Sequence, residues 1–289
     1  MNSSKSFRSR LRSLRTTAVG RVLNVPRRLA QASRYYLPQV PSILSWAARS
    51  REDTNFTYDL TDDSLRYLAH TVAVATGASA AIAQQYIAEA RSDWALERTV
   101  IDAIRRSPFR FVTDERCEFG RRLGWYAIAR IRKPRVVVET GVDKGLGAIL
   151  LCSALLRNEA EGVAGLYYGT DIDPKAGWLL CEPYSRMGRL LIGDSIESLK
   201  NMRESIDLFI NDSDHSADYE YREYQTVAPK LSADAIVLGD NAHVTPMLAR
   251  FAEERGMDFL HFREVPKAHW YPGCGIGIAF RRSPRRPDQ

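Results

Sequence analysis

Short apolar segments that alternate with helical segments constrain the second half of this 289-residue chain more than any other feature. From about residue 135, each apolar run has the length of a strand and ends close to a glycine, aspartate or asparagine. Strands separated by helices pair in parallel, so the pattern predicts an α/β fold with a doubly wound sheet. The runs are 135–139, 166–171, 189–192, 206–211 and 235–239, with two closing strands at 259–264 and 275–280.

The chain before this sheet divides into two parts of different composition. Residues 1–50 contain ten Lys and Arg residues and no acid, whereas residues 51–289 contain 31 basic and 35 acidic residues. Residues 51–112 have helical periodicity, with Thr61 as a predicted N-cap. We therefore expect a basic arm (1–50), a helical cap (51–112) and an α/β domain (113–289).

The basic arm leaves several interpretations open. Arginines interspersed with apolar residues suit a peripheral contact with an anionic membrane surface or an acidic polymer, and a transit peptide has a similar composition. A plainer interpretation is an extension that packs on a neighbouring subunit of a homo-oligomer. Nucleic acid is not an expected partner, because the body of the chain is acidic.

Cysteine usage and hydropathy bear on the compartment. The four cysteines form no CxxC pair, and no run of eighteen apolar residues occurs. These features predict a cytoplasmic protein with reduced thiols and without a membrane-spanning helix.

A glycine-rich turn follows the first predicted strand. The segment VVVETGVDKGLGAILL places Glu139, Gly141, Gly145 and Gly147 between that strand and a helix. Glycines let a backbone approach a ligand, and a helix N-terminus can receive an anion. The GxxxGxG order differs from the GxGxxG of dinucleotide enzymes, which argues against a nicotinamide oxidoreductase.

Acids stand at the ends of the next two strands. Asp171 lies where a carboxylate can accept hydrogen bonds from both hydroxyls of a ribose. Asp194 lies where it could meet the exocyclic amine of an adenine. Because ligands of open α/β sheets bind beyond the carboxyl ends of the strands, these acids predict a nucleoside-binding site.

Residues from about 134 to 281 resemble the class I S-adenosylmethionine-dependent methyltransferases. The resemblance implies a Rossmann-like, mostly parallel sheet of seven strands with a last antiparallel strand. Gly147 departs from the pattern, since the O-methyltransferase subgroup often has Ser there. The residues implied to bind S-adenosyl-L-methionine are Glu139 and Gly141 at the methionine end, Gly145 in the same turn, Asp171 at the ribose, and Asp194 with Ser195 at the adenine.

Polar side chains also end the fourth and fifth predicted strands. Adjacent parallel strands would bring Asp212 close to Asp240 and Asn241. Two carboxylates and an amide are hard oxygen donors, which suit Mg²⁺, Mn²⁺ or Ca²⁺. His215 follows three residues after Asp212.

This second cluster resembles that of the cation-dependent O-methyltransferases, which include catechol, caffeoyl-coenzyme A and antibiotic-sugar methyltransferases. The resemblance implies a metal on Asp212, Asp240 and Asn241, with His215 as general base. A metal lowers the pKa of a bound hydroxyl, and a histidine can take its proton near neutral pH. We therefore expect metal-assisted O-methylation of a sugar, a polysaccharide or a related small molecule.

Two alternatives stay open at this point. The acceptor could instead be a phenolic or catechol-type natural product. The chain could also bind S-adenosylmethionine without catalysis. Methylation of nucleic-acid amino groups is disfavoured, because the Pro-Pro-aromatic segment of those enzymes is replaced here by Ser213 and Asp214.

Overall fold

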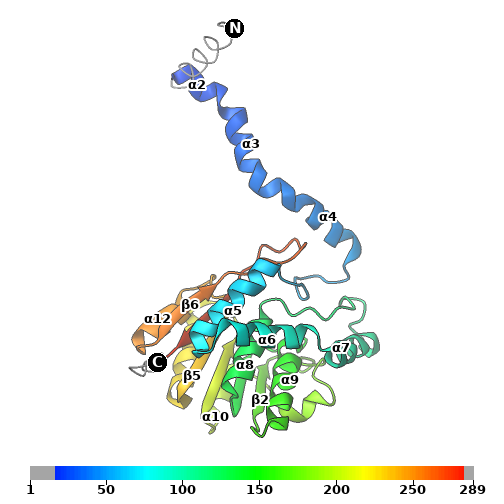
Figure 1. The fold of residues 1–289 in the computed structure, drawn as a ribbon, viewed down its shortest axis with the longest axis vertical. Helices are drawn as coiled ribbons and strands as arrows, with labels where there is room; N and C mark the ends of the chain where they lie inside the picture. The colour runs from blue at the N-terminus through cyan, green and yellow to red at the C-terminus, as the bar shows by residue number, and fades with distance from the viewer. Residues whose placement is uncertain (1–16, 283–289) are drawn as a thin grey trace. The chain divides into compact units, whose positions relative to one another are not determined.

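The computed structural model describes residues 17–282, which fall into two compact units. One unit consists of the residues before Arg51 together with Ala268–Trp270, and the other contains the rest of the chain. The first sixteen residues of the basic arm lie outside the described residues. Figure 1 shows the second unit as a sheet covered by helices.

Consecutive helices make up the described part of the N-terminal arm. Pro26, Pro38 and Pro41 each stand in the first turn of one of these helices, where the missing N–H leaves no bond unmade. The prolines therefore divide the arm into helices. The elements are α2 (Ala18–Leu23), α3 (Val25–Tyr36), η1 (Leu37–Gln39) and α4 (Val40–Arg49).

The second unit contains a seven-stranded sheet with the strand order β3-β2-β1-β4-β5-β7-β6. β7 is antiparallel to both of its neighbours, and the pairs from β3 to β5 are parallel. The predicted doubly wound, mostly parallel sheet with a last antiparallel strand is confirmed. The strands are β1 (Val136–Thr140), β2 (Leu166–Asp171), β3 (Gly188–Ile192), β4 (Ile206–Asn211), β5 (Leu231–Asp240), β6 (Asp258–Phe262) and β7 (Ile276–Phe280).

The parallel strands end level with one another. Thr140 of β1 is paired with Thr170 of β2 and with Asn211 of β4, and Asn211 is paired with Gly239 of β5. The chain therefore leaves these four strands along one edge of the sheet, where the polar residues gather.

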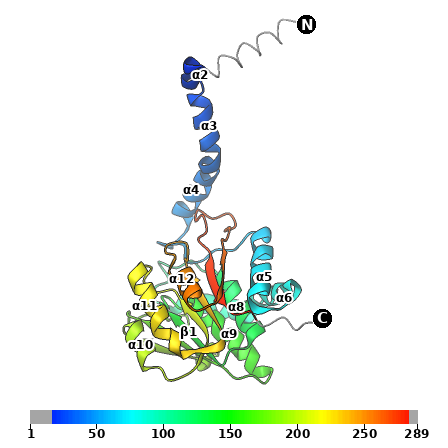
Figure 2. The same cartoon turned by 90° about the vertical axis from the view of Figure 1, so that its left-hand side faces the viewer.

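Helices cover both faces of the sheet. α8 contacts α9 on one face, while α11 contacts both α10 and α12 on the other face (Figure 2). In the buried core on that face, the ring of Tyr224 meets Phe209 of β4 edge to face and stacks on Phe251. The helices are α8 (Arg122–Arg132), α9 (Leu146–Ala160), α10 (Ser195–Asn201), α11 (Ala217–Val227) and α12 (Met247–Glu254), with the short 3₁₀-helices η2 (Tyr184–Met187) and η3 (Ala228–Lys230).

Three further helices precede the sheet in the chain: α5 (Asp62–Thr76), α6 (Ala80–Arg91) and α7 (Trp94–Arg106). The N-caps Thr61, Ser79 and Asp93 each accept a hydrogen bond from the backbone N–H three residues on. α5 and α6 both pack against α8. Within residues 17–282, no helix is long and apolar enough to cross a membrane.

Candidate active site

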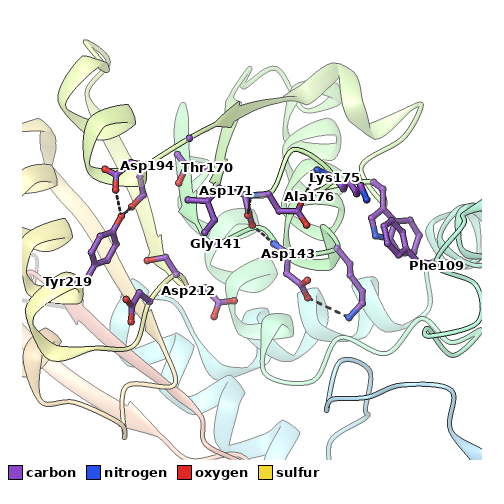
Figure 3. A pocket seen from close by; sticks show the side chains of 18 residues that line it. Phe109, Gly141, Asp143, Thr170, Asp171, Lys175, Ala176, Asp194, Asp212 and Tyr219 are labelled. Atoms are coloured by element: carbon purple, nitrogen blue, oxygen red, sulfur yellow. Dashed lines mark hydrogen bonds and ion pairs between the residues drawn. The ribbon is translucent and has the colours of Figure 1, made fainter.

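A cavity of about 630 Å³ lies beyond the carboxyl ends of four parallel strands. Its lining includes Gly141 after β1, Asp171 of β2, Asp194 after β3 and Asp212 after β4 (Figure 3). Of the predicted cofactor residues, Ser195 also lines the cavity, whereas Glu139 and Gly145 do not.

The turn between β1 and α9 depends on two glycines with positive φ. At Gly141, with a φ of 81°, a Cβ atom would lie 2.1 Å from the backbone oxygen of Asp212. At Gly145, with a φ of 95°, it would lie 2.9 Å from the Cα atom of Gly177. Gly141 therefore permits a close approach of the turn to the end of β4, and Gly145 packs on the segment after β2.

Asp171 is oriented by backbone N–H groups from two loops. Its Oδ1 accepts a hydrogen bond from the N–H of Asp173, and its Oδ2 accepts one from the N–H of Asp143, each at 2.8 Å. Each oxygen keeps a lone pair, so the carboxylate can accept hydrogen bonds from a ribose diol.

Two neighbours of Asp171 also face this ligand position. Ile172 lines the cavity and is 78% exposed, which offers an apolar surface to an adenine ring. Thr170 also lines the cavity, and its buried hydroxyl oxygen has no hydrogen-bond partner among the described residues. The cavity, the oriented carboxylate and this unpartnered hydroxyl together fit S-adenosylmethionine.

Asp194 and Ser195 are joined by a tyrosine that the sequence did not point to. Asp194 caps α10, and its Oδ2 accepts a hydrogen bond at 2.9 Å from the hydroxyl of Tyr219, as Figure 3 shows. The N–H of Glu197 and then Tyr219 lower the pKa of Asp194. Ser195 lies 2.9 Å from the same hydroxyl and donates to buried Glu223. Tyr219 lies on α11, so no strand-end pattern could indicate it.

Glu139 lies beneath the glycine turn, where it is 1% exposed. Its Oε2 accepts a hydrogen bond from the hydroxyl of Tyr167 at 2.7 Å, and a Cβ on Gly147 would lie 2.6 Å from its Oε1. Burial raises the pKa of Glu139 to about 7, against the lowering effect of Tyr167. Glu139 supports the turn from below, in place of the expected contact with the methionine end. It also leaves no room for a serine at Gly147.

At the end of β5, Asp240 is bound by Arg121, the N-cap residue of α8. Nε of Arg121 donates to Oδ1 of Asp240, and Nη2 donates to Oδ2. The two side chains are 4% and 1% exposed. Burial raises the pKa of Asp240, but the charge and the hydrogen bonds of Arg121, together with the charge of Arg122, outweigh burial and hold this pKa below its ordinary value.

Asp212 lies beside this ion pair, at the end of the cavity. Burial and the neighbouring Asp240 carboxylate raise the pKa of Asp212 well above its ordinary value, and a hydrogen bond joins the two carboxyl groups. Nη2 of Arg122 lies 3.9 Å from Oδ2 of Asp212.

His215 and Asn241 complete this side of the site. Nε2 of His215 lies 3.1 Å from Nδ2 of Asn241 and 3.9 Å from Oδ1 of Asp212. Oδ1 of Asn241 accepts a hydrogen bond from Nη2 of Arg121 at 3.2 Å, so its amide N–H faces the histidine. Nε2 is therefore the acceptor in the pair and carries the lone pair.

The three predicted metal ligands lie together, but they do not form an open ligand set. Both oxygens of Asp240 and the amide oxygen of Asn241 already accept hydrogen bonds from Arg121. Among the described residues, no group of three or more His, Cys, Asp or Glu side chains could hold a metal ion. This arrangement does not fit the divalent metal that the resemblance implies, because a guanidinium already supplies the compensating charge.

Comparison with known proteins agrees with this architecture. Residues 138–242 match a family described as a methyltransferase domain. They span the glycine turn, all of the cavity lining except Phe109, and the ends of β4 and β5. A search of curated proteins found no match.

Several solved structures have a distantly similar fold. A putative O-methyltransferase from Klebsiella pneumoniae is 17% identical with a TM-score of 0.48, covering 66% of this chain and 91% of that chain. The O-methyltransferase TomG from Streptomyces achromogenes, involved in tomaymycin synthesis and solved with S-adenosylmethionine, is 18% identical with a TM-score of 0.48 and the same coverage. The methyltransferase PaMTH1 from Podospora anserina is 20% identical with a TM-score of 0.46, covering 66% of this chain and 88% of that chain.

Residues 138–242 of the second unit therefore contain a methyltransferase domain, and the sheet order and the glycine turn give this unit a Rossmann-like methyltransferase fold. The chain is accordingly an enzyme of the transferase class, as the sequence predicted.

Replacement of Gly141 by Ala should distort the cofactor turn. The added Cβ meets the backbone oxygen of Asp212, and the residue must keep a positive φ. We expect a loss of about 3 kcal/mol in unfolding free energy and weaker binding of S-adenosylhomocysteine, measured by denaturant unfolding and calorimetry. Gly162→Ala is the matched control, because its φ is 89° but nothing lies within 4 Å. Equal effects of the two substitutions would contradict the predicted contact.

Replacement of Glu139 by Gln should change how stability depends on pH. The folded pKa of about 7 lies above the ordinary value of 4.5, so the stability contributed by the protonated carboxyl is fully present below pH 4.5. It is lost as the pH rises through about 7. Relative to the wild type, Glu139→Gln should gain up to about 3 kcal/mol between those limits, measured by urea unfolding across the range. If the free energies of unfolding of the two proteins changed with pH in the same way, the raised pKa of Glu139 would be contradicted.

Proposed function

We propose that this protein methylates a hydroxyl oxygen of a sugar, a polysaccharide or a related small molecule, with His215 as the general base. The observation that carries the proposal is the position of His215 beside Asp212, at the end of the cofactor cavity. A proton acceptor is needed at that point if the nucleophile is a hydroxyl, because a neutral alcohol is a poor nucleophile.

The proposed reaction combines methyl transfer from the cofactor with proton transfer from the acceptor to His215. S-adenosylmethionine supplies a methyl group on a sulfonium; the carbon–sulfur bond breaks as the acceptor oxygen bonds the methyl carbon, which leaves S-adenosylhomocysteine. The acceptor proton passes to Nε2 of His215, whose lone pair is directed at the strand ends. There the acceptor hydroxyl takes the place of the Asn241 amide. Asp171 and Tyr219 fix the cofactor, and this alignment contributes to the rate.

The polar character of the acceptor side supports a polyhydroxylated acceptor. Asp212, Ser213 and Asp214 line the adjoining end of the cavity, and Arg122 lies next to Asp212. These groups offer several hydrogen-bond donors and acceptors to neighbouring hydroxyls.

Replacement of His215 by Ala should lower kcat by at least about 100-fold, because the acceptor hydroxyl loses its base. Affinity for S-adenosylhomocysteine should stay unchanged, since His215 does not line the cofactor cavity. Transfer of labelled methyl groups and calorimetry measure the two quantities. His70→Ala, on the exposed side of α5, controls for the loss of a histidine. Wild-type turnover by His215→Ala would remove His215 from the mechanism.

The acceptor class is tested with the same labelled cofactor on a panel of sugars, oligosaccharides and catechols. We expect the label on a sugar hydroxyl. Label on catechols alone would contradict the sugar acceptor but leave O-methylation intact. Cofactor binding without transfer to any acceptor would contradict the proposed function itself.

A further inference from the structure

Arg121 is a completely satisfied cation at the end of the sheet. Its five N–H groups match five acceptor contacts: two to Asp240, one to Asn241, one to the hydroxyl of Tyr58 and one to Glu264. Fork-shaped binding of a carboxylate by a guanidinium is among the strongest charge-assisted hydrogen-bond geometries. The residue is therefore built into the site as a fixed positive charge.

A divalent cation on Asp240 would have to displace this guanidinium. Glu264 is fully buried and also accepts from Arg121, at 3.1 Å, so the guanidinium cannot swing away without separating a second buried ion pair. Separating buried ion pairs leaves uncompensated charge in a low-dielectric region. The negative charges of Asp240 and Glu264 are thus already compensated by the guanidinium of Arg121.

We propose that Arg121 takes the place of the divalent cation in this methyltransferase, so that it works without a metal and Arg121 acts as a positioning residue. This inference rests on the proposed function for its catalytic part. Arg121 holds the amide of Asn241, and Asn241 in turn holds the ring of His215 in place until the acceptor hydroxyl replaces the amide. The same residues that could hold a metal thereby orient the base.

Arg122 adds a second positive charge on the acceptor side. Its Nη2 lies 3.9 Å from Oδ2 of Asp212, which lines the cavity, and its guanidinium carbon lies 5.5 Å from the centre of the Trp125 ring. It can stabilise the negative charge that develops on an acceptor oxygen during proton removal.

Mn²⁺ binding, followed by electron paramagnetic resonance, tests the metal part without any turnover. The wild type should bind no Mn²⁺ that depends on Asp240. Arg121→Ala should gain a bound Mn²⁺ signal, because Asp212, Asp240 and Asn241 become free ligands, and Arg121→Ala/Asp240→Asn should lose it. Arg130→Ala is the matched control, since Arg130 is also buried on α8 and paired with acids.

The wild-type measurement decides the question even if Arg121→Ala fails to fold. Mn²⁺ bound by the wild type and abolished in Asp240→Asn would overturn the proposal. Activity that is lost after chelation and restored by Mg²⁺ would also overturn it; we expect no loss. If no acceptor is methylated under any condition, the proposed function fails while the Mn²⁺ result still stands.

Arg121→Lys tests the positioning part, because it keeps the charge but loses the fork. We expect kcat to fall at least about tenfold with a nearly unchanged KM for the acceptor, and methylguanidine to restore part of the kcat of Arg121→Ala. If Arg121 were only structural, Arg121→Lys would change the free energy of unfolding and leave kcat unchanged. A wild-type kcat in Arg121→Lys would therefore overturn the positioning role.

The basic arm carries a second, independent inference. α3 and α4 bury no residue, and the large apolar side chains of Leu29, Tyr36 and Leu44 are each more than 60% exposed. Helices of this length are marginal in water without a partner for their apolar face. Residues 1–50 contain no acid, so the partner of this arm should be anionic.

We further propose that the apolar face of α3 and α4 docks on an anionic lipid surface. Val25, Leu29 and Tyr36 share one side of α3 by their helical spacing, and Arg27 and Arg34 lie on the other side. An apolar face with flanking arginines is the arrangement by which a helix lies in the plane of a charged lipid interface.

Co-sedimentation of the full chain with vesicles tests this docking. The protein should sediment with phosphatidylcholine vesicles that contain phosphatidylglycerol, but not with pure phosphatidylcholine, and high salt should release it. Leu29→Glu/Leu44→Glu should lose binding to vesicles. Gln31→Glu/Ser45→Glu should lose less, because it introduces the same charge outside the apolar face.

Two results would overturn lipid docking. One is a self-associated protein that becomes monomeric in Leu29→Glu/Leu44→Glu and binds no vesicles, because the face would then be an interface between copies. The other is binding to an acidic polymer such as heparin without binding to anionic vesicles.

Discussion

The ion pair between Arg121 and Asp240 is the contact on which the acceptor side of this site depends. A carboxylate buried at the end of a central strand is stable only with a partner, and the N-cap residue of α8 supplies that partner. The same guanidinium also holds Asn241, Glu264 and Tyr58. One side chain thus joins the start of α8, the end of β5 and the segments around Tyr58 and Glu264.

The cofactor side and the acceptor side meet at Gly141. Its Cα approaches the backbone of Asp212 so closely that no side chain fits between them. Asp212 in turn forms a hydrogen bond to Asp240, which Arg121 binds. A methyl donor in the cavity and a hydroxyl near His215 would therefore be aligned by contacts at the carboxyl ends of β1, β4 and β5.

Much of the fold could be predicted because strand-length apolar runs in this chain end in polar residues. The run predicted at 206–211 coincides with β4, and Gly141 after β1 and Asp171 at the end of β2 line the cavity as parallel strand ends require. Glu139 lies beneath the glycine turn and outside the cavity lining, and a strand buried on both faces has no polar alternation to show which side a residue faces. Tyr219 was missed because it comes from a helix that crosses the sheet.

The sequence by itself determined the sheet and the edge at which the acids gather, because parallel strands align their carboxyl ends whatever surrounds them. Only the tertiary structure decided what neutralises those acids. Arg121 lies 119 residues before Asp240, and no spacing rule joins a helix N-cap to a strand end so far away. A guanidinium and a divalent cation can both compensate the same carboxylates, so strand-end residues alone do not distinguish them. The position of Arg121 at the start of α8, next to the end of β5, does distinguish them.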